Sequence, residues 1–309
     1  MGDYYDNIRK RAEGSFQNRP IADFLDRIKA IVGPAAAELQ GPAQEALDAI
    51  RQNREPSPKQ LAALELVIRT MRPAPLSKQG ELPDLEQELA SIFVEWEAFR
   101  VAVKPHLYTI GRIDQVRANG VGTGFLVSKT LLITNKHVLD VLSFGTNRLE
   151  QGQAVVLFRE EYNSSTEKAV DIVGVAAVHD TLDMALLRIE DTAFEDDRVP
   201  LSLGKNDSKV GNKVVTIGYP LNDKARNPFF IGAIFGDRFG VKRAAPGEII
   251  DTHNESIFHD CSTLGGNSGS PVIAIDTLQV VGIHRSGLFT YRNEAVNGKS
   301  LSDFVDAHI

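Results

Sequence analysis

Ser268 is the residue of this sequence best placed to act as a nucleophile. It lies in the segment GGNSGSP, residues 265–271, where glycines on both sides let a substrate approach the backbone closely. A serine hydroxyl is a weak nucleophile, so it needs a base within hydrogen-bond reach and a third group that orients this base. A histidine and an acidic residue must therefore occur in suitable places elsewhere.

Both residue types stand next to predicted strands. His137 follows the apolar stretch Leu131–Thr134, and Asp183 directly precedes the apolar run MALLRI. The order along the chain is histidine, aspartate, serine. A histidine after a strand is common in any protein, and so is a Gly-Asn-Ser-Gly turn, but the three motifs in this order and against these strands are specific in combination.

These motifs resemble the chymotrypsin-like serine protease superfamily. The resemblance rests on GTGFLVS (122–128), ITNKHVL (133–139), DMALLRI (183–189) and GGNSGSPV (265–272), and it covers about residues 106 to 300. It implies two six-stranded antiparallel β-barrels with the active site between them. His137 and Asp183 would then come from the first barrel and Ser268 from the second.

The resemblance also implies a role for each residue of the site. His137 takes the proton of Ser268 as general base and returns it to the leaving amine, while Asp183 holds the imidazole in the correct tautomer. The backbone N–H groups of Gly266 and Ser268 form the oxyanion hole. This implies a serine endopeptidase that cleaves protein or peptide substrates through an acyl-enzyme.

Other acidic residues and histidines fit this pattern less well. Asp171 and Asp180 are rival partners of the base, but the family pattern places the aspartate directly before the strand, as Asp183 is placed. The remaining histidines lack matching contexts and show no spacing typical of zinc ligands; they are His106, His179, His253, His259 and His308. We expect no metal and no other cofactor.

Substrate preference is expected to depend on the residues before the nucleophile and on the strand 280–287, which would pair with the substrate backbone. In both places the sequence resembles the glutamyl endopeptidase branch. Thr263 and His284 match the positions that receive an acidic side chain, and Gly287 lies on the same strand. Both side chains offer donors to a carboxylate without a permanently buried cation. This favours cleavage after Glu, and less well after Asp; the alternative is that His284 only packs on the barrel.

The elements that would position these residues are short and apolar. Past about residue 105, runs rich in Val, Ile and Phe alternate with Gly, Asn and Asp, which is typical of an all-β barrel or sandwich. The expected strands are Gly124–Val127, Leu131–Thr134, Ala154–Phe158, Met184–Ile189, Val214–Gly218, Phe229–Phe235, Val272–Ile275 and Val280–Ile283. A short helix is expected over Leu301–His308.

Residues 1–104 carry a different pattern. Apolar residues recur at steps of three and four, as on one face of a helix. The expected helices include Ile21–Ile31, Ala43–Ile50, Lys59–Met71 and Leu85–Val103. The chain is therefore predicted to have a helical domain at 1–104 and a protease domain at 105–309.

The role of the helical domain stays open at this point. It would recruit a partner, cover the active-site cleft or only stabilise the protein. The segment from Pro56 to Pro73 resembles the small helical effector-associated domains that bring bacterial proteases into signalling or defence systems. An effector protease, a housekeeping peptidase and a catalytically silent binding module with a protease fold are the alternatives for the whole chain.

Composition limits the other function classes. The 309 residues have a net charge of -7, which gives no basic footprint for nucleic acid. The polar N-terminus is unlike a secretory signal, and no run approaches the ~20 apolar residues that span a bilayer. Cys261 is the only cysteine, so no intramolecular disulfide is possible. These features favour a cytoplasmic protein.

Overall fold

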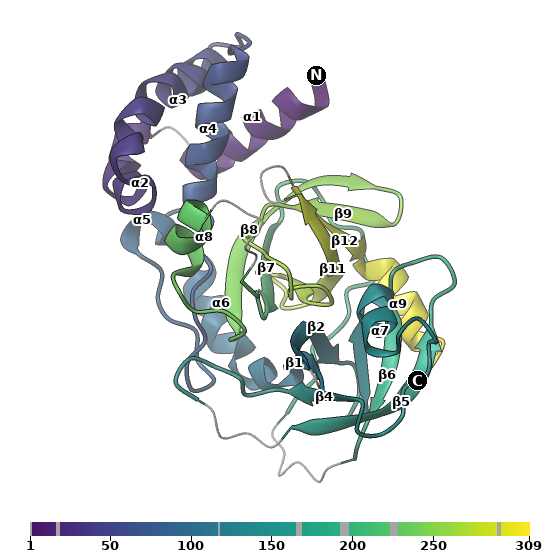
Figure 1. The fold of residues 1–309 in the computed structure, drawn as a ribbon. Coiled ribbons are helices and arrows are strands. Elements are labelled where there is room, and N and C mark those ends of the chain that lie inside the picture. Colours follow the sequence, from purple (N-terminus) through teal and green to yellow (C-terminus); the bar gives the residue numbers. More distant parts are fainter. Residues whose placement is uncertain are drawn as a thin grey trace.

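Two closed antiparallel barrels of six strands each follow a group of helices along the chain (Figure 1). The computed structural model describes residues 2–16, 19–116, 118–164, 169–191, 198–222, 228–288 and 292–309. The expected fold class, a helical N-terminal part followed by a chymotrypsin-like double barrel, is confirmed.

The first barrel brings together the two segments that carry His137 and Asp183. Its strands are β1 (Ile110–Gln115), β2 (Ala118–Leu126), β3 (Leu131–Thr134), β4 (Ala154–Leu157), β5 (Val170–Val178) and β6 (Ala185–Ile189). They close in the order β1-β2-β3-β6-β5-β4. Thr134 at the end of β3 pairs with Ala185 at the start of β6. The segment after β3 and the segment before β6 therefore lie at the same edge of the barrel.

The second barrel carries the glycine-rich segment. Its strands are β7 (Lys213–Gly218), β8 (Arg243–His253), β9 (Ser256–His259), β10 (Pro271–Ala274), β11 (Val280–Leu288) and β12 (Arg292–Asn297), and they close in the order β10-β11-β12-β9-β8-β7. Residues 260–270 connect β9 to β10.

Helices surround the barrels unevenly. The N-terminal ones are α1 (Gly2–Phe16), α2 (Leu25–Val32), α3 (Ala36–Arg51), α4 (Pro58–Thr70), α5 (Gln87–Ala90) and α6 (Trp96–Val103); the later ones are α7 (Lys136–Leu142), α8 (Pro228–Phe235) and α9 (Gly298–Asp306). Helix α4 begins with a capping box between Ser57 and Gln60, as the Ser-Pro start predicts. In Figure 1, α1–α4 lie beyond the second barrel, on the side away from the first.

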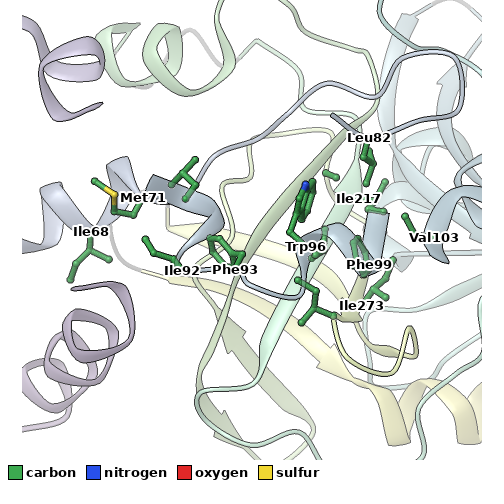
Figure 2. Packing of buried hydrophobic residues seen from close by; sticks show 14 of the residues in the cluster. Ile68, Met71, Leu82, Ile92, Phe93, Trp96, Phe99, Val103, Ile217 and Ile273 are labelled. Atoms are coloured by element: carbon green, nitrogen blue, oxygen red, sulfur yellow. The ribbon is translucent and has the colours of Figure 1, made fainter. Parts of the chain in front are cut away.

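The N-terminal helices share a hydrophobic core with the barrels. Figure 2 shows Ile68 and Met71 next to Ile92 and Phe93, and Trp96, Phe99 and Val103 close to barrel residues; all belong to one buried cluster that includes Ile217 of β7 and Ile273 of β10. The prediction that residues 1–104 form a separate domain stays a prediction. The contacts themselves join it tightly to the second barrel.

Two of the expected elements are wrong. The single helix expected over Leu85–Val103 is divided into α5 and α6, with turns at residues 91–95. These turns hold the Phe93 ring 5.6 Å from the guanidinium carbon of Arg72, and the β-branched and aromatic residues between the two helices have only moderate helix propensity.

The strand expected over Phe229–Phe235 is the helix α8, which packs against α2. A continuous apolar run has no periodicity that separates a buried strand from a buried helix. The helix expected over Leu301–His308 is confirmed as α9, which begins three residues earlier at Gly298 because Asn297 caps it through the amide of Ser300.

Candidate active site

His137 and Asp183 meet at the edge of the first barrel. Nδ1 of His137 lies 2.7 Å from Oδ2 of Asp183, and the backbone amide of His137 donates to Oδ1 of the same carboxylate at 2.9 Å. The carboxylate therefore binds the residue at two points, which fixes both the ring and the start of α7. Neither Asp171 nor Asp180 replaces it at this position: Asp171 lies within β5, and Asp180 is exposed.

Asn135 holds the aspartate segment in place. Its side-chain amide donates to the backbone carbonyl of Asp183 at 2.8 Å, and the residue is fully buried. Burial raises the pKa of Asp183, but the hydrogen bond and the charge of His137 outweigh it and hold the pKa below its ordinary value. Asp183 is therefore an ionised acceptor near neutral pH. The histidine and aspartate side chains are 46% and 23% exposed, so a substrate can reach the pair.

The nucleophile segment needs glycine at two positions. Gly266 and Gly269 both have φ of +88°, a region that side chains rarely adopt. A Cβ on Gly269 would lie 2.0 Å from the carbonyl oxygen of Thr123, and one on Gly266 would lie 2.4 Å from that of Tyr219. The backbone of this segment therefore packs directly against its neighbours.

Contacts with β2 place Ser268 at the junction of the barrels. The amide of Thr123 donates to the carbonyl of Ser268 at 2.8 Å, and the Thr123 hydroxyl donates to the carbonyl of Gly266 at 2.7 Å. Gly122 is the common neighbour of nucleophile and base, since a Cβ there would lie 2.7 Å from Val138 of α7 and 3.1 Å from the carbonyl of Ser268. The serine backbone and the helix of His137 thus meet at one point.

The two amides expected to form the oxyanion hole are unoccupied by protein groups. Within the ranges that the structure describes, neither Gly266 N–H nor Ser268 N–H donates to a protein acceptor. The preceding carbonyl, that of Gly265, is held by the amide of Leu221 at 2.7 Å. Two donors on a segment anchored in this way can stabilise a developing negative charge.

The residues expected to bind the substrate side chain lie on β11 and on the segment between β9 and β10. Thr263 Oγ1 donates to Oδ1 of Asn293 at 2.8 Å, and a Cβ on Gly287 would lie 2.3 Å from that same oxygen. His284 in β11 is buried, and its Nδ1 lies 3.2 Å from Nε2 of His259. The structure thus brings Thr263 and Gly287 together through Asn293 and pairs His284 with a second histidine.

His259 and Asn293 contact the candidate substrate-binding residues but were not predicted to belong to the site. His259 was expected to have no site role, yet its ring contacts His284 at a centroid distance of 5.3 Å. Burial lowers the pKa of His259 to about 4, although the charge of Asp260 opposes this. Burial also lowers the pKa of His284 well below its ordinary range. Two neutral rings therefore lie side by side; the register of β9 with β12, which pairs Asn293 with His259, was not readable from local motifs.

The other histidines lie elsewhere or make local contacts. Nδ1 of His179 accepts the amides of Thr181 and Leu182, and His308 contacts the carbonyl of Phe304. Across the described residues, no group of three or more His, Cys, Asp or Glu side chains is arranged to hold a metal ion. The described part of the chain also contains no helix with the length and apolar character needed to cross a bilayer.

Comparison with known proteins identifies the family. Residues 122–283, more than half of the chain, match the family described as trypsin-like peptidase domain, and the chain belongs to this family. A probable serine protease of Lysobacter enzymogenes is 28% identical over 253 residues, which cover 67% of this chain and 65% of the relative. A glutamyl endopeptidase of Staphylococcus aureus is 25% identical over 230 residues, covering 72% of this chain and 60% of that protein.

Solved structures share the fold at lower identity. The serine endoprotease of Yersinia pestis is 18% identical, with a TM-score of 0.50 over 68% of this chain and 66% of that chain. The structure of Deg5 is 20% identical, with a TM-score of 0.50 over 72% of this chain and 95% of that chain. The chain spans less than two thirds of the length of the curated relatives described above.

Proposed function

We propose that this chain is a serine endopeptidase with His137, Asp183 and Ser268 as its catalytic triad. His137 takes the proton of Ser268 Oγ as the oxygen attacks the scissile carbonyl, and it then gives that proton to the leaving amine. The amides of Gly266 and Ser268 bind the oxyanion. Water, deprotonated by His137, hydrolyses the acyl-enzyme and restores the serine.

The observation that supports this proposal most is that the Asp183 carboxylate accepts two hydrogen bonds from His137, one from the ring and one from the backbone amide. Helix α7, which carries His137, also lies close to the backbone of Ser268 at Gly122. Such a pair orients a base, and a binding module with a protease fold would not need it. The segment 265–271 also carries two amides, those of Gly266 and Ser268, that donate to no backbone acceptor among the described residues.

The test is cleavage of a denatured protein mixture by the protein and by its Ser268→Ala variant, with the new peptide ends identified by mass spectrometry. We expect serine-dependent ends from the wild type and none from the variant. A serine-directed fluorophosphonate that labels neither protein, together with no new ends, would favour a catalytically silent binding module.

We also propose that the pocket beside Thr263 and His284 accepts an acidic side chain. Among the matched relatives, several are named glutamyl endopeptidase. The shared proton of the histidine pair is assigned to Nε2 of His259, because the opposite tautomer would bury an N–H at Nδ1 of His259, which has no partner among the described residues. This assignment leaves Nε2–H of His284 as a donor for a carboxylate.

The neutral histidine pair suits a pocket that is empty between substrates. A permanent cation buried there would be costly without a partner, whereas a neutral ring gains a proton or donates a hydrogen bond only when the carboxylate arrives. We expect cleavage after Glu, and less well after Asp. If the serine-dependent peptide ends follow other residues, the proposed triad would be supported and the proposed acidic pocket would be wrong.

For the N-terminal helices we propose a role beyond covering the cleft. Their position beyond the second barrel (Figure 1) favours recruitment of a protein partner or support of the site over inhibition by blockage. Under recruitment the chain is an effector protease that cleaves a chosen protein in bacterial signalling or defence; under support alone it is a housekeeping peptidase. Affinity capture with the full-length Ser268→Ala variant, compared with a variant carrying charge reversals on α3, tests recruitment.

A further inference from the structure

A buried network of charged side chains joins the N-terminal helices to the second barrel. Asp260, directly after β9, lies at its centre. Its Oδ2 is 2.8 Å from Nε of Arg72 and 3.1 Å from Nε of Arg11. The side chains of Asp260, Arg72 and Arg11 are 0%, 1% and 2% exposed. Two arginines from the helical region, one in α1 and one just after α4, therefore enclose one carboxylate of the protease region.

The network is balanced by further partners on the barrel. Glu248 of β8 contacts Nη2 of Arg72 at 3.1 Å and Nζ of Lys213 at 2.6 Å, and its amide donates to Oδ1 of Asp260 at 2.8 Å. Burial raises the pKa of Asp260, but the charges of Arg72 and Arg11 outweigh it and hold the pKa well below its ordinary range. Asp260 is therefore a buried anion that depends on these arginines, because an unpaired charge in the interior is strongly unfavourable.

Asp260 is directly connected to one half of the substrate pocket. The residue before it is His259, whose Nε2 lies 3.2 Å from Nδ1 of His284. Because the two residues are consecutive, a shift of the Asp260 backbone moves the end of β9 and with it the ring of His259. Such a shift would break the contact that orients His284.

The residues after Asp260 lead to the other half of the pocket. The carbonyl of Cys261 accepts the side-chain amide of Asn293 at 2.6 Å, and Asn293 in turn accepts the hydroxyl of Thr263 at 2.8 Å. Ser262 donates to the backbone carbonyl of Arg72 at 2.6 Å. The segment 260–263 is therefore clamped to the helical region at Arg72 by both an ion pair and a hydrogen bond.

The catalytic pair has no comparable connection. His137 and Asp183 are held by the paired ends of β3 and β6 and by the amide of Asn135, all within the first barrel. Among the described residues, none of the ion pairs that link the helical region to the second barrel involves His137 or Asp183.

We propose that Arg72 and Arg11 are positioning residues for the substrate pocket. By holding Asp260 they fix segment 259–263, from which His259 orients His284 and Thr263 faces Asn293. The N-terminal helices are then a working part of substrate recognition, and a change in their packing alters which bond is cleaved. This inference rests on the proposed function, which supplies the pocket.

The variant Arg72→Met tests the proposal in the full-length protein. It leaves Asp260 with Arg11 and Glu248 with Lys213, and it keeps the backbone carbonyl that Ser262 contacts, so the fold is expected to persist. For a peptide with Glu before the scissile bond we expect kcat/KM to fall roughly 10- to 100-fold, mostly through KM. The rate of fluorophosphonate labelling at Ser268, which needs no acidic side chain, is expected to change by less than about threefold.

Three further variants separate positioning from general stability. Arg11→Met is expected to act in the same direction, and Arg72→Lys, which keeps the charge, is expected to recover part of the loss. Phe99→Leu loosens the shared core of Figure 2 without changing the charged network, and it should leave KM for the same peptide unchanged. The proposal is overturned if Phe99→Leu raises KM as much as Arg72→Met, or if Arg72→Met lowers labelling and cleavage equally.

Amide hydrogen exchange gives a readout that does not depend on activity. Arg72→Met should lose protection in residues 259–264, while residues 131–139 of the catalytic pair keep theirs. If the wild type produces no new peptide ends and is not labelled at Ser268, the proposed function fails, yet this measurement still tests the connection. Unchanged protection in 259–264 would overturn the connection even in a fully active enzyme.

Discussion

The two barrels hold their shares of the site in different ways. The first barrel positions His137 and Asp183 with its own strands, and the pair is partly exposed. The second barrel positions the pocket residues His284 and Thr263 inside a buried set of polar contacts that continues, through Asp260, into the N-terminal helices. Under the proposed function, bond cleavage and substrate recognition are thus supported by different parts of the chain.

These two modes of support indicate which residues can be substituted without loss of the proposed chemistry. A base and its acid need a fixed mutual geometry that two adjacent strands supply. A pocket needs a fixed shape and charge, and we infer that here this shape depends on Arg11, which pairs with Asp260 across 249 positions of the chain. Substitutions in the two regions should therefore separate turnover from preference.

The largest effect is expected from Asp183→Asn, in the His137–Asp183 pair that the first barrel positions. The amide cannot accept the Nδ1 proton of His137 as the carboxylate does, so the ring loses its preferred tautomer and the stabilisation of its charged form. We expect kcat to fall about 10⁴-fold, with KM little changed. Steady-state kinetics on a peptide substrate checks this, and a loss of less than tenfold would point to a different acidic partner.

The next largest effect is expected from Gly266→Ala, where the nucleophile segment packs against its neighbours. The φ of +88° and a clash at 2.4 Å with the carbonyl of Tyr219 force the segment to move and displace an oxyanion donor. We expect kcat to fall roughly 10²- to 10³-fold.

Gly265→Ala is the matched control for this substitution, because a Cβ at Gly265 meets no atom within 4 Å. Its kcat should stay close to that of the wild type. Equal losses in the two variants would show that the segment tolerates no side chain at all, and the specific demand on Gly266 would be wrong.

A smaller and selective effect is expected from His284→Leu, on the recognition side. The leucine keeps the buried volume apolar but removes the donor for a substrate carboxylate. We expect the ratio of kcat/KM between matched Glu and Gln peptides to fall roughly 10- to 100-fold, as for loss of a hydrogen bond to a charged group. This ratio does not depend on the folded fraction.

Arg285→Gln is the neighbour control. The Arg285 guanidinium pairs with Glu294 at 2.5 Å, so it is engaged outside the histidine pair. The Glu/Gln ratio should be unchanged in this variant. A similar drop in both variants would mean that general positive charge, and not the ring of His284, selects the substrate.

Much of the fold was predictable because the signals are local, and the same kind of signal points to the candidate triad, which stays a prediction. His137, Asp183 and Ser268 each stand beside an apolar strand or among glycines, so the few residues around them carry the information. The residues of α8 predict a strand as readily as a helix, because seven consecutive residues that are almost all apolar fit either element. The packing of α8 against α2 favours the helix, and this contact joins residues far apart in the sequence.

The contacts of the proposed pocket and the charged network were not predictable, because they too depend on residues far apart in the sequence. His259 contacts a residue 25 positions away, and Arg11 pairs with a carboxylate 249 positions away. Neither has a characteristic spacing. An isolated histidine or arginine in a sequence is usually solvated or satisfied locally, and only strand register and helix packing bring these residues to the site.

The smallest effect is expected from His259→Gln, and it concerns stability against pH. In the folded protein burial lowers the pKa of His259 from 6.5 to about 4, while in the unfolded chain it stays near its ordinary value. As the pH falls from 6.5 towards 4, the unfolded state therefore binds a proton that the folded state does not. The free energy of unfolding is fully retained above this window and falls within it, by at most about 1.4 kcal/mol per pH unit for each such group.

His284 adds a second contribution in the same direction, because burial also lowers its pKa well below the ordinary value. Glutamine at 259 can still donate to Nδ1 of His284 but does not titrate, so the variant should lose about one of the two contributions to the slope. Urea unfolding at several pH values between about 7 and 4 measures this slope. An unchanged slope would mean that His259 is protonated in the folded protein, and the neutral pair that we assign to the pocket would be wrong.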